Sequence, residues 1–442
     1  MRMLVQTVVR VVSVLVVIAL PAHAARAVRA VRAATADVVV PAPDVVTRVV
    51  LRASATTASA DIGSLRPGEQ AELLGSVPNW YRVRLANGTE GFVSKRWTRL
   101  EQDADGPVIT VDVADLGTGL GILVRGPDFT LVYDGGSNDD LARGEENRML
   151  AYVREVAPSL TTIDHVILSH PHRDHVELLP DLFAAYEVRE VWDSGRLNDI
   201  CGYRAFLAAV RDEPGVAYHT ATEGGGVGSH VFGAKTCYGD SLPAEDIRIP
   251  QASRIDQAPV ALGEGASMTF LHADGSDHDS PNENSLVVRL DLGRTRILLM
   301  GDAEAGGRKP PTEAPAPQSI EGVLVACCAA ELSAQVLVVG HHGSTTSSRT
   351  AFLDAVDATI FVVSSGPKKY GSVVLPDSSI IDVLSARGTV FRTDTDDDAC
   401  RLNGAKVGPD GDGRVGGCDN IRIVSSPTGA PRVSIFRGAI PP

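Results

Sequence analysis

Three histidines and one aspartate follow a short predicted strand near the middle of the chain. Residues 163–168 predict the strand, and the sequence His-Pro-His-Arg-Asp-His occupies positions 170–175. His170 and His172 can point to one side of the backbone and hold one metal ion, while Asp174 and His175 on the following turn reach a second. Because only 11 histidines occur in 442 residues, this cluster is not expected by chance. The chain must therefore fold so that a strand ends at a metal site.

Length and composition indicate a globular protein of two or three domains. The 442 residues are about three times the usual domain length of about 150 residues. A hydrophobic content of 44% and a charged content of 22% exclude wholesale disorder. The formal net charge of -14 argues against binding to nucleic acid through a broad basic face.

The N-terminus has the three parts of a secretory signal peptide. Two arginines accompany the apolar run at residues 11–20, which is about half as long as the ~20 residues that cross a bilayer as a helix. An Ala-x-Ala cleavage signal ends at Ala24. We expect cleavage of residues 1–24 to leave a secreted or extracytoplasmic protein without a membrane span. Residues 25–44, rich in Ala, Val, Arg and Pro, predict a linker.

Residues 45–100 predict a small all-β unit, because short alternating runs are separated by turn signals. Tyr81, Val83 and Leu85 share one face of the clearest run. The segment resembles a bacterial SH3-like domain. The resemblance is carried by Val50-Leu51-Arg52, Ile62-Gly63, Pro67-Gly68, Trp80-Tyr81-Arg82-Val83 and Gly91-Phe92-Val93. It implies an accessory domain that binds cell-wall peptide; the alternative is a spacer barrel whose aromatic side chains only fill a core.

Beyond residue 106, predicted strands alternate with helical stretches, which is typical of an α/β domain. In this setting positions 170–175 resemble the signature of the metallo-β-lactamase fold, a four-layer αβ/βα sandwich, and we assign residues 107–437 to such a hydrolase domain. Further motifs resemble the hydrolase domain of ComEC-type DNA-internalisation proteins. These motifs are Asp115-Leu116-Gly117-Thr118-Gly119, Asp134-Gly135-Gly136, Met300-Gly301-Asp302-Ala303-Glu304, Val339-Gly340-His341-His342-Gly343 and Lys369-Tyr370-Gly371.

The resemblance implies a dinuclear centre that binds two divalent metal ions. Imidazole and carboxylate donors favour zinc, with manganese or iron as alternatives. Asp134 would orient a ligand histidine, and Asp302, which follows an apolar strand, would bridge both ions. Either His341 or His342 would complete the second metal site, and the other would contact the substrate.

The third ligand of the first metal ion is open between two interpretations. His278 lies between two predicted strands, where the broad fold carries a ligand. The ComEC-type pattern instead resembles Asn282-x-Asn284 at this place, without a histidine. Tyr370 is a further candidate for contact with the substrate.

The six cysteines are an even number, and disulfides are permitted in an exported chain. The pair Cys400–Cys418 brackets a turn-rich stretch and is expected first, since closing this loop would contribute about 3 kcal/mol. The pair Cys201–Cys237 is expected next. The adjacent Cys327 and Cys328 are expected to be free and buried, because a bond between them would be strained.

These features predict an exported, metal-dependent hydrolase. A hydroxide held at the dinuclear site, oriented by Asp174 or Asp302, would attack the scissile group. The resemblance implies a phosphodiester substrate, as in DNA or another nucleic acid. The alternatives are an amide or ester hydrolase, including β-lactam hydrolysis, and a non-catalytic protein that binds the cell wall.

Overall fold

The structure is a computed structural model, and two units of the chain are described from it. The residues described are 37–42, 45–67, 69–85, 87–102, 108–139, 141, 143–222, 226–366, 368–395, 419–425 and 430–436. One unit lies within residues 1–103 and the other within residues 104–442. The expected signal peptide and the expected pair Cys400–Cys418 lie outside the described residues. Within the described residues, no helix combines the length and the apolar character needed to cross a lipid bilayer.

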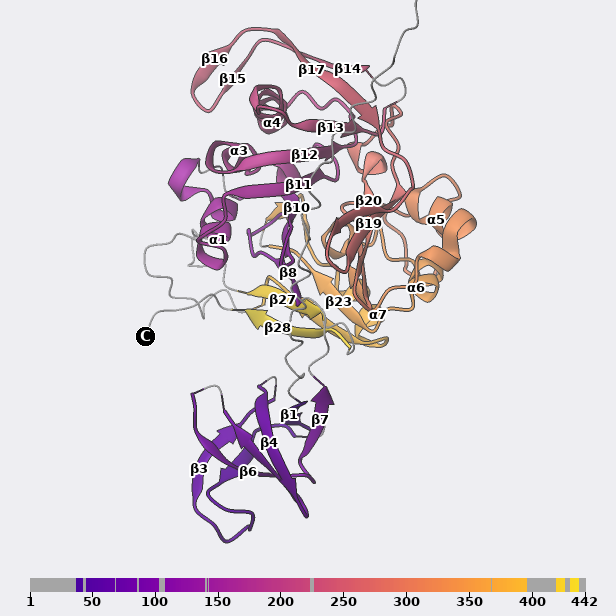
Figure 1. Cartoon of the computed structure of the whole chain (residues 1–442). Helices are drawn as coiled ribbons and strands as arrows, with labels where there is room; N and C mark the ends of the chain where they lie inside the picture. The colour runs from indigo at the N-terminus through magenta and orange to yellow at the C-terminus, as the bar shows by residue number, and fades with distance from the viewer. Residues whose placement is uncertain are drawn as a thin grey trace, which may run out of the picture. The chain divides into compact units, whose positions relative to one another are not determined.

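The N-terminal unit is an antiparallel sheet with the strand order β3-β2-β6-β5-β4-β1-β7 (Figure 1). Its strands are β1 (Asp37–Pro41), β2 (Val49–Arg52), β3 (Asp61–Leu65), β4 (Ala71–Val77), β5 (Trp80–Arg84), β6 (Glu90–Ser94) and β7 (Thr98–Gln102). Val83 is buried beside Leu51 and Val93, and Tyr81 packs on the same core, as the alternation of β5 predicted. Strand β1 lies inside residues 25–44, interpreted above as a linker, and pairs with β4 and β7.

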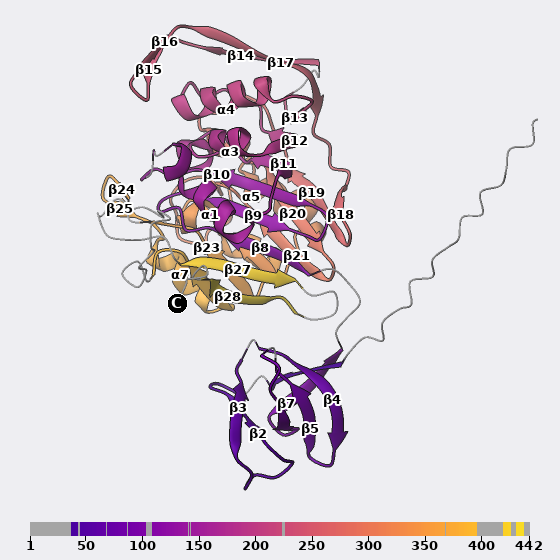
Figure 2. The ribbon, with the colours of Figure 1, turned by 60° about the vertical axis from the view of Figure 1, so that its left-hand side comes forward.

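The second unit contains two large sheets. The first has the order β14-β17-β13-β12-β11-β10-β9-β8-β27-β28, and the second has the order β18-β19-β20-β21-β22-β23-β26. The strands of the first sheet are β8 (Ile109–Val113), β9 (Gly121–Arg125), β10 (Thr130–Gly135), β11 (Thr162–Leu168), β12 (Glu187–Asp193), β13 (Ala217–Thr220), β14 (Gly226–Phe232), β17 (Glu245–Arg254), β27 (Asn420–Ser425) and β28 (Arg432–Phe436). Figure 2 shows β27 and β28 beside β8, where they extend the sheet.

The second sheet faces the first, and side chains from both share one core. Its strands are β18 (Val260–Gly263), β19 (Ala266–His272), β20 (Val287–Leu292), β21 (Thr295–Leu299), β22 (Val336–Val338), β23 (Ile360–Val363) and β26 (Thr389–Arg392). Short elements complete the unit: β15 (Lys235–Cys237), β16 (Asp240–Leu242), β24 (Lys369–Tyr370), β25 (Val373–Val374), η1 (Gly144–Glu146), η2 (Pro281–Asn284), η3 (Ala329–Glu331) and η4 (Gly340–Gly343).

Helices cover the outer face of each sheet, which confirms the predicted αβ/βα sandwich (Figure 1). The helices packed on the first sheet are α1 (Arg148–Val156), α2 (Arg173–Val176), α3 (Pro180–Ala185) and α4 (Cys201–Asp212). Those packed on the second are α5 (Ile320–Cys328), α6 (Thr350–Val356) and α7 (Ser378–Ser385). Because both faces of the central strands are covered, β10 is buried along its whole length. The Tyr133 hydroxyl donates to the carbonyl oxygen of Leu286 at 2.9 Å and joins the two sheets.

The cysteines differ in part from expectation. Cys201, which begins α4, is bonded to Cys237 at the end of β15, with their Cα atoms 5.5 Å apart. The expectation of two free and buried cysteines was wrong, because Cys327 and Cys328 are bonded to each other and Cys327 is exposed. The backbone leaves helical geometry at Cys328 (φ −138°, ψ 22°), so these residues turn at the end of α5 and do not enter the core.

Candidate metal centre

The chain brings polar side chains together at the carboxyl ends of four strands. Positions 170–175 follow β11, and Asp134 is the penultimate residue of β10, which runs parallel to β11. Asp302 follows β21, and the His341-His342 pair follows β22, its parallel neighbour in the second sheet. Since parallel strands end at one edge of a sheet, both sheets deliver their ligands to the same place.

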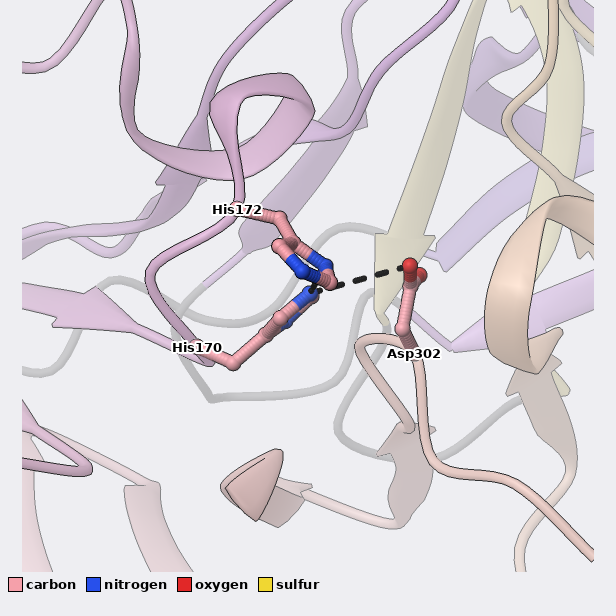
Figure 3. A group of neighbouring side chains, drawn as sticks. All are labelled: His170, His172 and Asp302. Atoms are coloured by element: carbon pink, nitrogen blue, oxygen red, sulfur yellow. Dashed lines mark hydrogen bonds and ion pairs between the residues drawn. The ribbon is translucent and has the colours of Figure 1, made fainter. Parts of the chain in front are cut away.

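The first candidate metal-binding group consists of His170, His172 and Asp302. Figure 3 shows the two histidines on one loop, pointing toward the carboxylate from the facing sheet. Nε2 of His170 lies 3.0 Å from Nδ1 of His172 and 3.7 Å from Oδ2 of Asp302. Ligand atoms that share a tetrahedral zinc ion at about 2.0–2.1 Å lie about 3.3 Å from one another. The spacing of this group therefore suits one divalent ion.

The second group consists of Asp174, His175 and His342. Nε2 of His342 lies 3.7 Å from Oδ2 of Asp174. Asp302 also borders this group, because its Oδ1 lies 3.1 Å from Nε2 of His175 and 3.6 Å from Nε2 of His342. The two oxygens of Asp302 thus face different groups, which is the arrangement required of a bridging carboxylate.

Buried atoms without hydrogen-bond partners support the fit to metal ions. Within the described residues, Nε2 of His175, Nε2 of His342 and Oδ1 of Asp302 are buried and accept or donate no hydrogen bond. A buried polar atom left unsatisfied costs about 1–3 kcal/mol, so native proteins rarely tolerate three together. Divalent ions would satisfy all three atoms, and the donor set of imidazole and carboxylate suits zinc, manganese or iron.

Asp134 fixes the orientation of His175 from behind. Its Oδ2 accepts from Nδ1 of His175 at 2.8 Å and from the Ser169 hydroxyl at 2.7 Å, and its Oδ1 accepts from the Ser169 amide at 2.7 Å. With Nδ1 held as a donor, Nε2 of His175 is left to face the metal site. Gly136 allows this approach, since a Cβ atom there would lie 2.3 Å from the His175 amide nitrogen.

The adjacent His341 and His342 have different surroundings, although both adopt positive φ angles in η4. Nδ1 of His342 lies 2.8 Å from the carbonyl oxygen of Ser364, which leaves Nε2 facing the second group. The His342 side chain is 3% exposed, whereas that of His341 is 22% exposed. Nδ1 of His341 lies 3.0 Å from Oε1 of Glu304. The structure therefore brings His342 among the ligand atoms and His341 beside them.

Charge and burial oppose each other at this centre. Burial by itself would raise the pKa of Asp302, but the neighbouring histidines, His175 above all, hold it well below its usual range. Burial lowers the pKa of His170. Burial also lowers the pKa of His341, but Asp302 and Glu304 outweigh it and raise this pKa above its ordinary value. These pKa shifts favour the ionised form of Asp302 and the neutral form of His170, which are the forms that bind metal.

A cavity of about 470 Å³ opens beside the two groups. Tyr370 lines it, and its hydroxyl donates to Oδ2 of Asp174 at 3.0 Å. Asn138 donates to the same oxygen at 2.6 Å. Asn282 also lines the cavity and donates to Oε1 of Glu304 at 2.9 Å. Tyr370 and Asn282, two substrate candidates from the sequence, thus lie at the mouth of the metal centre.

The structure does not bring two other candidates to the metal groups. Nε2 of His278 lies 2.8 Å from Oδ2 of Asp274, on a loop outside both groups. Asn284 is buried and donates to the carbonyl oxygens of Asp274 and Ser276 at 2.8 Å, so it holds that loop together. Asp302 occupies the third place beside His170 and His172 instead.

Sequence reasoning missed four residues that border the site, namely Ser169, Asn138, Arg173 and Glu304. Ser169 directly precedes His170, and Glu304 stands two residues after Asp302, so proximity to a motif was the available signal. Asn138 comes from the loop after β10 and had no such signal, because only the fold brings it to Asp174.

Comparisons with known proteins agree with this architecture. Residues 114–366 match the model of the metallo-beta-lactamase superfamily, and residues 47–99 match that of the bacterial SH3 domain. Competence protein ComA of Neisseria gonorrhoeae is 35% identical over 103 residues, which are 23% of this chain and 13% of the relative. Recombination protein 2 of Haemophilus influenzae is 24% identical over 278 residues, which are 63% of this chain and 26% of the relative.

Among solved structures, the metallo-beta-lactamase fold protein YhfI from Bacillus subtilis is similar in part. It is 14% identical with a TM-score of 0.36, and the match covers 65% of this chain and 97% of that protein. The chain spans about a quarter of the length of Recombination protein 2 and a smaller part of ComA. The matched region in Recombination protein 2 is therefore a portion of a much longer protein.

Proposed function

Since the chain belongs to the metallo-beta-lactamase superfamily, and is a metal-dependent hydrolase with an SH3 domain at its N-terminal side, we propose that it hydrolyses phosphodiesters in DNA or another nucleic acid. The observation that carries the proposal is the pair of ligand groups that share Asp302 at the floor of a cavity of about 470 Å³. Two arginines, Arg173 and Arg308, line the same cavity and suit an anionic substrate. The choice of nucleic acid rests on the resemblance to the hydrolase domain of DNA-internalisation proteins.

His170, His172 and Asp302 would hold one ion, and Asp174, His175 and His342 the other, with Asp302 shared. Two divalent ions held there, proposed to be zinc, would supply Lewis-acid activation of water and polarisation of the scissile phosphoryl group.

Side chains around the cavity would position the substrate and its protons. Asp174, held by hydrogen bonds from Asn138 and Tyr370 to its Oδ2, would orient the attacking water. Asp302 and Glu304 raise the pKa of His341 above its ordinary value, and His341 would give a proton to the leaving oxygen.

The proposal is tested by metal analysis followed by assays of one protein preparation on three substrates. We expect cleavage of bis-p-nitrophenyl phosphate and of single-stranded DNA, and no turnover of nitrocefin. His172→Ala and Asp302→Ala should abolish cleavage, and Asp302→Ala should lose more metal because Asp302 borders both groups. Turnover of nitrocefin without cleavage of either phosphodiester would overturn the proposal in favour of amide hydrolysis. If the protein holds no metal and turns over none of the substrates, only a non-catalytic binding function would remain.

We further propose that the protein is exported and that its SH3 domain binds cell-wall peptide. A cavity of about 490 Å³ in this domain is lined by Trp80, Trp97 and Arg48, and Trp97 is 42% exposed. Exposed aromatic and cationic side chains suit a peptide with carboxylate groups. Sedimentation with purified peptidoglycan tests the binding, and Trp97→Ala should reduce the bound fraction. Equal sedimentation of both proteins would overturn the proposed binding. Export is tested separately, by the N-terminal sequence of protein recovered from the culture medium.

A further inference from the structure

One arginine in the metal cavity has an unusual environment. Arg173 stands between two candidate ligands in the chain, His172 and Asp174, and its half-buried side chain lines the cavity of about 470 Å³. Within the described part of the chain, its guanidinium group makes no hydrogen bond and no ion pair. A guanidinium carries five N–H donors and stays charged, so the donors of Arg173 are free to bind an anion in the cavity.

Other arginines near the cavity do have partners. Arg308 also lines the cavity, where it donates to the Ser344 hydroxyl at 3.2 Å and pairs with Asp377 at 2.5 Å. Arg196 pairs with Asp277 on a neighbouring loop. The carboxylates of these two pairs offset the positive charge, so Arg173 supplies the cavity with its one uncompensated guanidinium among the described residues.

We propose that Arg173 binds a second phosphate of the substrate, next to the phosphate that is hydrolysed. This inference rests on the proposed phosphodiester function and names its substrate class as a chain of at least two phosphodiesters. The scissile phosphate must lie at the ligand groups, and Arg173 lies in the same cavity but in neither group. A planar guanidinium binds two phosphate oxygens at once, which an uncharged cavity wall cannot do.

The contact with the neighbouring phosphate contributes to binding and does not take part in the chemical step. It forms equally in the ground state and the transition state, so its loss should raise KM and leave kcat nearly unchanged. A hydrogen-bonded charged pair contributes about 1.5–3 kcal/mol, which predicts a rise in KM of about 10- to 100-fold. Lysine keeps the charge but loses the bidentate geometry, so Arg173→Lys should restore part of the affinity.

The test compares substrates that differ only in the charge next to the cleaved bond. A thymidine trinucleotide is compared with two versions in which the 5′ or the 3′ linkage is an uncharged methylphosphonate. For one of these versions, wild-type KM should rise by about the same factor that Arg173→Ala produces on the parent trinucleotide. Arg173→Ala should then cause no further rise in KM on that version, because the methylphosphonate already lacks the charge that Arg173 would bind. Arg173→Ala should raise KM for bis-p-nitrophenyl phosphate, which has one phosphate, much less than it raises KM for the trinucleotide.

Two controls separate binding from damage to the metal centre. Metal content and melting temperature of Arg173→Ala should match the wild type, and Arg189→Ala removes an exposed guanidinium, paired with Asp164, without effect on KM. Binding of a fluorescein-labelled trinucleotide, followed by anisotropy, gives a readout without turnover when measured in His172→Ala. In that background Arg173→Ala should weaken binding by about 10-fold or more.

The outcomes distinguish the two proposals. If the wild type cleaves no phosphodiester, the proposed function fails, and the inference fails with it. If the wild type cleaves the trinucleotide but Arg173→Ala lowers activity equally on the trinucleotide and on bis-p-nitrophenyl phosphate, the proposed function stands and the inference is overturned. An unchanged KM on the trinucleotide likewise overturns it.

Discussion

Oδ2 of Asp134 lies 2.8 Å from Nδ1 of His175, and both side chains are fully buried. Asp134 adopts a left-handed conformation (φ 57°) that turns its carboxylate from β10 toward the start of α2. The contact decides which nitrogen of His175 is free to bind a metal ion, because the carboxylate accepts the proton of Nδ1. The orientation of one candidate ligand therefore depends on a residue from a different strand.

Asp134→Asn should weaken metal binding by about 10- to 100-fold, because an amide accepts less strongly than a carboxylate and also presents donors to His175. Asparagine tolerates the left-handed backbone, so the fold should be kept. Affinity is measured by competition with a chromophoric chelator. Ser169→Ala serves for comparison, since it removes the hydroxyl contacts to Asp134 and to Nδ1 of His170 but keeps the carboxylate on His175, and its effect should be smaller. Equal affinity of Asp134→Asn and the wild type would contradict an orienting role.

His342→Ala and His341→Ala should have different effects on metal content. His342→Ala removes a buried nitrogen of the second group and should lower the bound metal from two ions toward one. His341→Ala should retain both ions and lower kcat by about 100-fold, the usual scale for loss of a general acid. Inductively coupled plasma mass spectrometry and steady-state kinetics give the two readouts. Loss of metal from His341→Ala with full retention in His342→Ala would reverse the assignment.

The disulfide between Cys201 and Cys237 should contribute to stability under oxidising conditions. It closes a loop with a sequence separation of 36 residues, and the chain-entropy model gives about 4 kcal/mol for a loop of this length. The double variant Cys201→Ser/Cys237→Ser should lower the free energy of unfolding by up to that amount, measured by urea denaturation without reductant. In the matched control Cys327→Ser/Cys328→Ser the change should be small, because that bond joins adjacent residues and closes almost no loop.

Local spacing explains why part of the metal centre is predictable from the sequence. His170, His172, Asp174 and His175 lie within seven residues after the end of β11, the last two in α2, so their close spacing is enough to predict one site. His341 and His342 are adjacent, and spacing cannot choose between them. The choice depends on the left-handed turn in η4 and on the carbonyl group of Ser364, which accepts from His342.

Long-range packing accounts for the features that the sequence did not predict. Asp302 was expected as a bridging ligand from the resemblance, but its place beside His170 and His172, considered for His278, was not. It lies more than 120 positions after His170 and reaches that place only because the two sheets face each other. The bond between Cys327 and Cys328 depends on where α5 ends, and helix ends are the least predictable part of an element. The buried network around Glu321 also lacks a sequence signal, because its partners are backbone amides.

Glu321 connects α5 to the loop that follows the His341-His342 pair. Its carboxylate accepts from the amides of Ser348 and Arg349, and the side chain is buried. Burial raises the pKa of Glu321 from 4.5 to about 7, although the two amides and the Arg349 charge act in the opposite direction. The Arg349 guanidinium in turn donates to the carbonyl oxygens of Lys309, Thr345 and Gly307, so one network supports this side of the cavity.

The raised pKa of Glu321 predicts that stability falls as the pH rises through neutrality. A carboxyl group whose pKa is higher in the folded state than in the unfolded state stabilises the fold fully below pH 4.5, and this contribution is lost as the pH rises through about 7. The expected loss between pH 5 and pH 8 is about 3 kcal/mol. Glu321→Gln removes the titration, so the free energy of unfolding of the wild type should fall relative to that of the variant over this range. Urea denaturation of both proteins at fixed metal concentration measures the difference, and parallel pH profiles would show that Glu321 titrates at its ordinary pKa.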